Sequence, residues 1–259
     1  MKNKTSSILF FALIAILLAG CASAQTAVPT ALRTDTAAPT PVPPTPTSDL
    51  PSAVGKLHWF GVSSILYHGS KNIYFDPYIL SGNLPTADLI LISHAHSDHA
   101  DLESLKQIIG PHTTLIISPN VTAFYELNKA ELGVPATVLA EGETVQVGEI
   151  VVKAYPAYDS SFHPRSAGGM GYVVTVDGER IYFAGGTNFY PEMSQIESDV
   201  TVYPMYAKDD VEKVIEVLPT TVMIPVHTSG PGAKAYEALF AKLPTKMKFV
   251  ALDAGPYNP

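Results

Sequence analysis

One short segment, from Leu89 to Leu102, constrains the fold and chemistry of this chain more than any other. It reads "LILISHAHSDHADL" and holds three of the eight histidines in 259 residues. The apolar run Leu89 to Ile92 predicts a strand that is buried on both faces, since such strands show no polar alternation. A histidine-rich turn directly after a buried strand indicates a functional site at the end of that strand.

The spacing of the polar residues in this segment favours metal binding. His94 and His96 are two residues apart, so on an extended chain both side chains face the same way. Asp98 and His99 follow as the chain turns, and imidazole and carboxylate groups are ligands for Zn²⁺, Mn²⁺ or Fe. The alternative is a polar turn in which Asp98 or Ser97 caps a helix at residues 101–109. Capping explains one residue and leaves the histidines unexplained.

The N-terminal segment predicts export. Lys2 and Lys4 precede the apolar run Ile8 to Ala19, which is too short to span a bilayer comfortably and is typical of a signal peptide. The run ends in "LAGC", which resembles the lipobox of bacterial lipoproteins. We therefore expect a signal peptide at residues 1–20, lipidation of Cys21, and a protein of the cell envelope that is anchored to a bacterial membrane. An ordinary secretory signal cut elsewhere is the alternative.

Composition divides the remainder into a tether and one domain. Residues 21–53 are rich in Thr and Pro and hold few large apolar side chains, which predicts a disordered tether before a domain at 54–259. The formal net charge is -8, and cleavage after residue 20 removes two lysines and no acid. Such an acidic chain argues against nucleic acid as a partner. With a single cysteine, the chain forms neither intrachain disulfides nor thiolate metal clusters.

The order of apolar patterns predicts two sheets with helices outside them. Three β-rich runs in residues 56–78 suggest an antiparallel meander, and strand and helix patterns alternate over residues 87–132. Strand patterns return over residues 136–183, with a hairpin turn at Asp177-Gly178. Strand–helix alternation resumes from residue 199, with helices expected at 208–218 and 232–243 and a last strand at 248–255. This order is typical of an α+β or α/β sandwich.

With these residues in view, the chain resembles a known family. His94-Ala95-His96-Ser97-Asp98-His99 matches the HxHxDH signature of the metallo-β-lactamase fold. Further similarity lies in "GVSSILYHGSKNIYFDPY", "GGMGYVVTVDGERIYFAGGTNFYPEM" and "PVHTSG". These stretches resemble the branch that includes ascorbate-6-phosphate lactonase. The resemblance implies an αββα four-layer sandwich with metals in a cleft along one edge.

The same resemblance implies two sets of metal ligands. His94, His96 and His163 match the first site, and Asp98, His99 and His227 match the second. Asp76, in "YFDPY", either accepts a hydrogen bond from a ligand histidine and so orients it, or only forms the turn before Pro77.

Two positions depart from the family pattern. The metal-bridging aspartate belongs in a "GDT" turn, but this chain has Gly186 there, followed by Asn188 where relatives are often acidic. Relatives often carry histidine at the position of Val62. Without the bridging carboxylate we expect a tight first metal and a weak or absent second one, with Asn188, Asp159 and Asp76 as candidate replacements.

The predicted function is that of a membrane-anchored metal-dependent hydrolase. A hydroxide on one or two Zn²⁺ ions, or on Mn²⁺ or Fe, would attack a small lactone, ester or phosphodiester, with Asp98 as ligand or general base. Arg165 either binds an anionic group of this small-molecule substrate or is a solvated surface residue. The alternatives are a metal- or ligand-binding lipoprotein that lost catalysis with the change to Gly186, and redox chemistry at an iron site.

Overall fold

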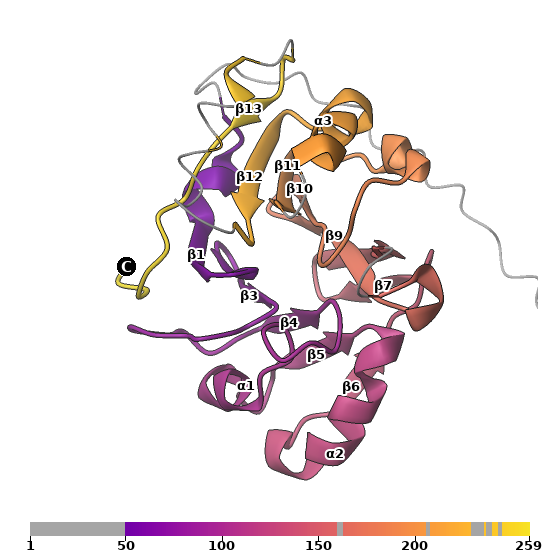
Figure 1. The fold of residues 1–259 in the computed structure, drawn as a ribbon. Helices are drawn as coiled ribbons and strands as arrows, with labels where there is room; N and C mark the ends of the chain where they lie inside the picture. The colour runs from indigo at the N-terminus through magenta and orange to yellow at the C-terminus, as the bar shows by residue number, and fades with distance from the viewer. Residues whose placement is uncertain (1–49, 160–162, 206–207, 229–235, 237–239, 243–244) are drawn as a thin grey trace, which may run out of the picture. The chain divides into compact units, whose positions relative to one another are not determined.

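The computed structural model describes residues 50–159, 163–205, 208–228, 236, 240–242 and 245–259 (Figure 1). The expected signal peptide, Cys21 and most of the expected tether lie outside these ranges. Within them, no helix has the length and apolar character needed to cross a membrane. A short 3-10 helix, η1 (Ser52–Lys56), opens the domain, and the Ser52 and Ala53 backbone N–H groups donate to the Glu179 carboxylate at 2.7 and 2.6 Å. The last residues assigned to the tether therefore contact the domain.

The first sheet has six strands in the order β1-β2-β3-β4-β5-β6. They are β1 (Leu57–Gly61), β2 (Ser64–His68), β3 (Asn72–Phe75), β4 (Leu89–Ile92), β5 (Thr114–Ile117) and β6 (Ala136–Val138). The first three strands pair antiparallel, which confirms the predicted meander, and β3 to β6 pair parallel. The parallel connections contain α1 (Leu102–Ile108), and η2 (Pro119–Val121) with α2 (Thr122–Leu132).

The second sheet has seven strands in the order β13-β12-β11-β10-β9-β8-β7. They are β7 (Thr144–Val147), β8 (Ile150–Pro156), β9 (Met170–Val176), β10 (Glu179–Phe183), β11 (Val200–Pro204), β12 (Val222–Val226) and β13 (Lys248–Phe249). Strands β7 to β10 pair antiparallel, including the predicted hairpin at Asp177-Gly178, and β10 to β13 pair parallel. The connections hold η3 (Arg165–Ala167), η4 (Pro191–Gln195) and α3 (Lys208–Val217).

Side-chain alternation along the strands explains why the two sheets pack face to face. Leu89 and Leu91 of β4 enter the core between the sheets, whereas Ile90 and Ile92 enter the core beneath α1 and α2. On the other sheet, Ile224 of β12 joins the central core and Met223 joins the core beneath α3. Because successive side chains of a strand alternate, each strand supplies both layers. The predicted αββα sandwich is confirmed.

Three expectations about single elements change in detail. The N-cap of α1 is Asp101, whose carboxylate accepts from the Ser104 N–H at 2.9 Å, so neither Ser97 nor Asp98 has this role. The last strand covers only Lys248–Phe249 instead of residues 248–255. Most of the helix expected at 232–243 lies outside the described residues.

One edge of the sandwich gathers the carboxyl ends of strands from both sheets. Strands β8, β10, β11 and β12 all run in one direction, so the residues after them emerge together. At this edge the Met170 N–H donates to the Ser93 carbonyl, and the Tyr172 hydroxyl donates to the Ile92 carbonyl, both at 2.9 Å. These bonds attach the end of β4 to the second sheet and place the histidine-rich turn beside the ends of its strands.

Candidate metal centre

Asp76 is a buried carboxylate that accepts hydrogen bonds from residues of the histidine cluster. Its carboxylate has no solvent exposure and accepts from the Ser93 N–H at 2.6 Å and the Ser93 hydroxyl at 2.5 Å. It also lies 2.6 Å from His99 Nδ1. An ionised carboxylate only accepts hydrogen bonds, so Nδ1 of His99 carries the proton and Nε2 keeps its lone pair. Of the two interpretations predicted from the sequence, a turn residue or a residue that orients a ligand histidine, Asp76 makes the contact that the second one requires.

The same network orients His94. Its Nδ1 lies 2.9 Å from the Ser93 hydroxyl, whose proton is donated to Asp76. Nδ1 of His94 therefore donates to the serine oxygen, and its Nε2 presents a lone pair to the cluster. Both rings are held in the tautomer that a metal ligand requires, by partners that themselves are buried.

The structure brings together all six residues that the resemblance assigns as metal ligands. His94, His96 and His163 form one group and Asp98, His99 and His227 another, each with donor atoms within 4.8 Å of one another. A third combination, Asp76 with His94 and His99, meets the same distance limit. Because both oxygens of Asp76 already accept from Ser93 and His99, this combination supports ligands instead of forming a separate site.

Two of the distances between donor atoms, one in each group, are close to those around a bound ion. Two ligand atoms of a tetrahedral zinc ion lie about 3.3 Å apart when each bond is about 2.05 Å. His94 Nε2 and His96 Nδ1 are separated by 3.2 Å, and Asp98 Oδ2 and His227 Nε2 by 3.4 Å.

His227 is held at the end of β12 by its backbone. It has a positive φ of 51°, and its N–H donates to the Val62 carbonyl at 2.7 Å. Val62 itself has a φ of 49°, and its carbonyl also accepts from the Trp59 indole N–H at 3.0 Å. Positive φ is costly for residues other than glycine and concentrates at functional sites. Val62 therefore differs from the family pattern only in its side chain, and its backbone carbonyl still positions the candidate ligand His227.

Burial favours the neutral form of three of the clustered histidines, His94, His163 and His227. Burial, followed by the neighbouring His99, His163 and other histidines, holds the pKa of His94 far below its ordinary value of 6.5. Burial also lowers the pKa of His163, with Asp159 opposing it, and lowers that of His227, with Asp98 opposing it. A neutral imidazole has the lone pair that coordinates a cation.

His163 contacts the carboxylate of Asp159, one of the three residues predicted as possible replacements for the bridging aspartate. Its Nε2 lies 3.2 Å from Oδ2 of Asp159, whose exposure is 4%. The other ring nitrogen, Nδ1, is buried without a hydrogen-bond partner. The backbones of the two residues pair as an isolated antiparallel bridge, with the Asp159 N–H donating to the His163 carbonyl at 3.0 Å.

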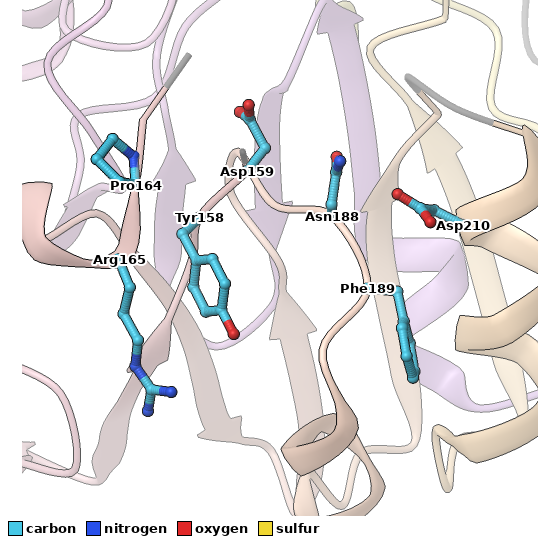
Figure 2. A pocket seen from close by; sticks show the side chains of 7 residues that line it. All are labelled: Tyr158, Asp159, Pro164, Arg165, Asn188, Phe189 and Asp210. Atoms are coloured by element: carbon cyan, nitrogen blue, oxygen red, sulfur yellow. The ribbon is translucent and has the colours of Figure 1, made fainter. Parts of the chain in front are cut away.

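A pocket of 340 Å³ adjoins the cluster through Asp159 (Figure 2). It is lined by Tyr158, Asp159, Pro164, Arg165, Asn188, Phe189 and Asp210. Figure 2 shows Asp159 and Asn188 toward one end of the pocket, and the Arg165 guanidinium toward the other. Asn188 thus lines this pocket.

Arg165 is a surface residue, with 43% of its side chain exposed, and its guanidinium is paired with carboxylates. It forms ion pairs with Glu141 and, at 3.3 Å, with Glu192, and its guanidinium lies 5.6 Å from the centre of the Tyr158 ring. Its charge is therefore already balanced by two carboxylates.

The remaining three histidines lie outside both ligand groups. His58 Nε2 lies 2.9 Å from the Gly255 carbonyl, and its ring packs edge-on against Phe60, so this histidine is a packing residue. His68 contacts Asn72, and His112 is exposed. Among the aromatic residues near the candidate ligands, Tyr158 lines the pocket, and Tyr190 and Tyr203 are buried in the core beneath α3.

Comparison with known proteins agrees with this arrangement. Residues 56–227 match the Beta-lactamase superfamily domain, a span that includes every residue of both ligand groups. A UPF0173 metal-dependent hydrolase of Thermoplasma volcanium is 30% identical over 225 residues, covering 78% of this chain and 93% of that protein. The chain belongs to the UPF0173 metal-dependent hydrolases of the metallo-β-lactamase superfamily.

Other relatives of the family extend the match. The UPF0173 metal-dependent hydrolase of Pyrococcus furiosus is 31% identical over 228 residues, covering 77% of this chain and 97% of that one. The structure of Igni18, a metallo hydrolase of Ignicoccus hospitalis, superposes with a TM-score of 0.61 at 18% identity, covering 77% of this chain and 95% of that one. A protein of Parabacteroides distasonis superposes with a TM-score of 0.65 at 23% identity, covering 77% of this chain and 93% of that one. At these identities the structural matches support the fold alone.

The donor set suits the metal that the family name implies. The buried imidazoles of His94, His99 and His163, the tautomers fixed at His94 and His99, and an unsatisfied ring nitrogen on His163 all fit a divalent cation. Gly186 stands where the resemblance places the bridging aspartate, and a side chain at this position would meet two of the histidines. A Cβ added at Gly186 would lie 2.8 Å from His94 Cε1 and 2.9 Å from His163 Nε2. The absence of a side chain at Gly186 is what lets these two rings approach.

Proposed function

We propose that this UPF0173 metal-dependent hydrolase acts on a small ester or lactone at the edge of its sandwich. The observation that carries the proposal is the pair of ligand groups with donor atoms 3.2 and 3.4 Å apart, next to a pocket of 340 Å³. A divalent metal bound there lowers the pKa of a coordinated water to near neutrality and polarises the electrophile. Zn²⁺ is the proposed ion, with Mn²⁺ or Fe as alternatives.

The residues of the chain have distinct tasks in this proposal. The two groups hold the metal, and Asp76 keeps His99 in its binding tautomer. Asp98 is a ligand of the second group, since its Oδ2 lies 3.4 Å from His227 Nε2 and 3.8 Å from His99 Nε2. If the second group holds no metal, the same carboxylate, whose side chain is 36% exposed, is instead the proposed general base.

The chemistry of the pocket favours a neutral substrate over a phosphodiester. Its one lining cation, Arg165, is paired with Glu141 and Glu192, and its lining carboxylates are Asp159 and Asp210. An anionic substrate group therefore meets no unpaired cation among the lining residues. A neutral lactone or a simple ester needs none.

A turnover measurement tests this proposal. The full chain, purified in detergent and loaded with Zn²⁺, would be offered p-nitrophenyl acetate, a γ-lactone and bis-p-nitrophenyl phosphate. We expect hydrolysis of the ester and the lactone that disappears with a chelator and in a His94→Asn variant. Equal rates for the loaded chain and the variant on all three substrates would refute the hydrolase.

The second candidate is a metal-binding lipoprotein without catalysis. The observation that favours it is Gly186, which removes the carboxylate that relatives use between the two metals. Metal retention with no turnover on any substrate would support this candidate.

Export and membrane anchoring through Cys21 form a separate proposal, supported by the lipobox-like "LAGC" alone. In a bacterial host the wild-type chain is expected in the membrane fraction and a Cys21→Ser variant is expected to lose its lipid. Identical N-terminal masses for the two mature proteins, apart from the substituted residue, would refute lipidation.

A further inference from the structure

The turn between β1 and β2 holds a strained residue that contacts a candidate metal ligand. Val62 lies in this turn with a φ of 49°, and a positive φ is an outlier for a β-branched residue. The ligand is His227, which also has a positive φ, of 51°. Strained backbone of this kind persists only where surrounding contacts hold it. The contacts that hold Val62 are therefore part of what places His227.

The Val62 carbonyl is the point where these contacts meet. It accepts from the His227 N–H at 2.7 Å and from the Trp59 indole N–H at 3.0 Å. A carbonyl oxygen has two lone pairs, so both donors bind it at the same time. The indole N–H fixes the direction of this carbonyl, and with it the acceptor that the backbone of His227 uses.

Trp59 is itself held on both sides. Its side chain is 6% exposed and packs in the core between the sheets. Its backbone pairs with Ile65 of β2 on one side and bridges to Ala254 on the other, and its carbonyl accepts from the Gly255 N–H at 3.1 Å. A residue held in this way is a fixed reference for the Val62 carbonyl.

The position of the His227 backbone matters for the second ligand group, which consists of Asp98, His99 and His227. His227 Nε2 lies 3.4 Å from Asp98 Oδ2, and its ring stacks on that of His99 with the ring centres 5.6 Å apart. Ligand side chains work only when they are held within about 0.5 Å of the binding geometry. A shift of the His227 backbone should therefore weaken metal binding at the second group and leave the first group unchanged.

We propose that Trp59 is a positioning residue of the metal centre. Its indole N–H holds the Val62 carbonyl, and this carbonyl holds the His227 backbone where the imidazole binds the ion of the second group. Trp59 is not a ligand in this proposal and acts through Val62. The proposal rests on the metal-dependent function proposed above.

Zinc-binding measurements test this role without relying on turnover. The full chain, its Trp59→Phe variant and a His227→Asn variant would be titrated with Zn²⁺ against a chromophoric chelator. Trp59→Phe keeps an aromatic ring and removes the N–H, and His227→Asn identifies the binding step that belongs to the second group. Tyr74→Phe is the matched control, because it removes another buried aromatic donor to a backbone carbonyl, that of Pro85 at 2.8 Å.

We expect two binding steps in the wild type and in Tyr74→Phe, the weaker of which is lost in His227→Asn. In Trp59→Phe the weaker step should lose affinity by on the order of 10-fold while the tighter step is unchanged. When Trp59→Phe is combined with His227→Asn, it should have no further effect on zinc affinity, because the residue through which Trp59 acts no longer binds.

Three results would overturn the proposal and leave the proposed function standing. They are wild-type affinity at both steps in Trp59→Phe, a loss of affinity that persists in the His227→Asn background, and a wild type with a single step that His227→Asn does not change. The second of these would show that Trp59 acts on the fold in general. Absence of bound zinc in the wild type would overturn both this inference and the proposed function.

A second substitution covers the case in which Trp59→Phe fails to fold. Replacement of Trp59 by 3-benzothienylalanine keeps the bicyclic ring and has a sulfur atom in place of the N–H. Trp59 is the one tryptophan of the chain, so tryptophan replacement changes a single position. The weaker zinc step should lose affinity as in Trp59→Phe, and unchanged affinity would overturn the role of the indole N–H.

Discussion

Replacing Asp76 by asparagine tests whether a buried carboxylate holds the metal centre together. Asp76 has a φ of 42°, a conformation that asparagine also adopts readily, so the substitution adds little backbone strain. The amide oxygen can still accept from the Ser93 N–H. The amide NH₂ group, however, then faces the Ser93 hydroxyl and the His99 Nδ1–H, where the carboxylate accepted both.

The magnitude follows from these three contacts. Hydrogen bonds to a charged partner are worth roughly twice those between neutral groups, about 1.5–3 kcal/mol against about 1 kcal/mol. In Asp76→Asn all three bonds lose their charged partner, and the bond to His99 is kept only if that ring changes tautomer, while the cost of burying a charge is relieved. We expect the metal-free chain to lose about 3 kcal/mol of unfolding free energy.

Metal affinity should fall through the tautomer of His99. To avoid two facing N–H groups, His99 moves its proton from Nδ1 to Nε2, which removes the lone pair that faces Asp98. Zinc affinity of this group should drop by about 10- to 100-fold.

Urea unfolding in the presence of a chelator, and zinc competition titration, measure the two effects. Asp88→Asn is the control, because Asp88 also accepts from a backbone N–H, that of Asn72 at 2.8 Å, but its side chain is 41% exposed. The control should change stability by less than about 1 kcal/mol and leave zinc affinity unchanged. An Asp76→Asn chain that unfolds and binds zinc like the wild type would refute the reasoning.

Further expectations concern packing and pH. Gly186→Ala should lower the free energy of unfolding by about 1–3 kcal/mol and weaken zinc binding, because the added methyl group would press on His94 and His163. Gly55→Ala, which has open space around it, should change neither quantity. Equal melting temperatures of the two variants would contradict this expectation. Hydrogen bonds from Lys56, Ser70 and Tyr67 hold the pKa of Asp177 well below its ordinary value, so they stabilise the fold above pH ~4 and are lost as pH falls further. The difference in melting temperature between wild type and Asp177→Asn should therefore shrink below pH ~4, and a constant difference would contradict the assignment. The pKa values of His94, His163 and His227 are lowered in the folded protein, so below pH ~6.5 the unfolded chain binds more protons than the folded one. The free energy of unfolding of the metal-free protein should therefore fall by up to about 1.4 kcal/mol per histidine for each pH unit below that value. Urea unfolding from pH 7.5 to 5.5 measures this loss. A flat profile would contradict it.

Local patterns were enough to predict the layers of this protein. The unbroken apolar run of β4 predicted a strand covered on both faces, and Leu89 and Ile90 do enter opposite cores. The spacing of His94 and His96 predicted that both face one point, because side chains two residues apart on an extended chain are parallel. The turn at Asp177-Gly178 predicted its hairpin for an equally local reason, since the turn needs positive φ and both residues have it. Such features depend on neighbours in sequence, which is why the sequence alone determined them.

Only the tertiary structure decided which polar groups meet across segments. Asp76 and His99 are 23 positions apart, and nothing in "YFDPY" distinguishes a turn from a hub that fixes a histidine tautomer. The loop after β8, which carries Asp159 and His163, is bonded to the residues after β10 through the Asn188 N–H and the Tyr158 carbonyl, and the sequence does not show that these two loops meet. The sequence showed that Gly186 lacks a carboxylate, but the approach of His94 and His163 into its space is a property of packing between two sheets. Contacts between segments that lie far apart in the sequence therefore decided which donor atoms meet at this site.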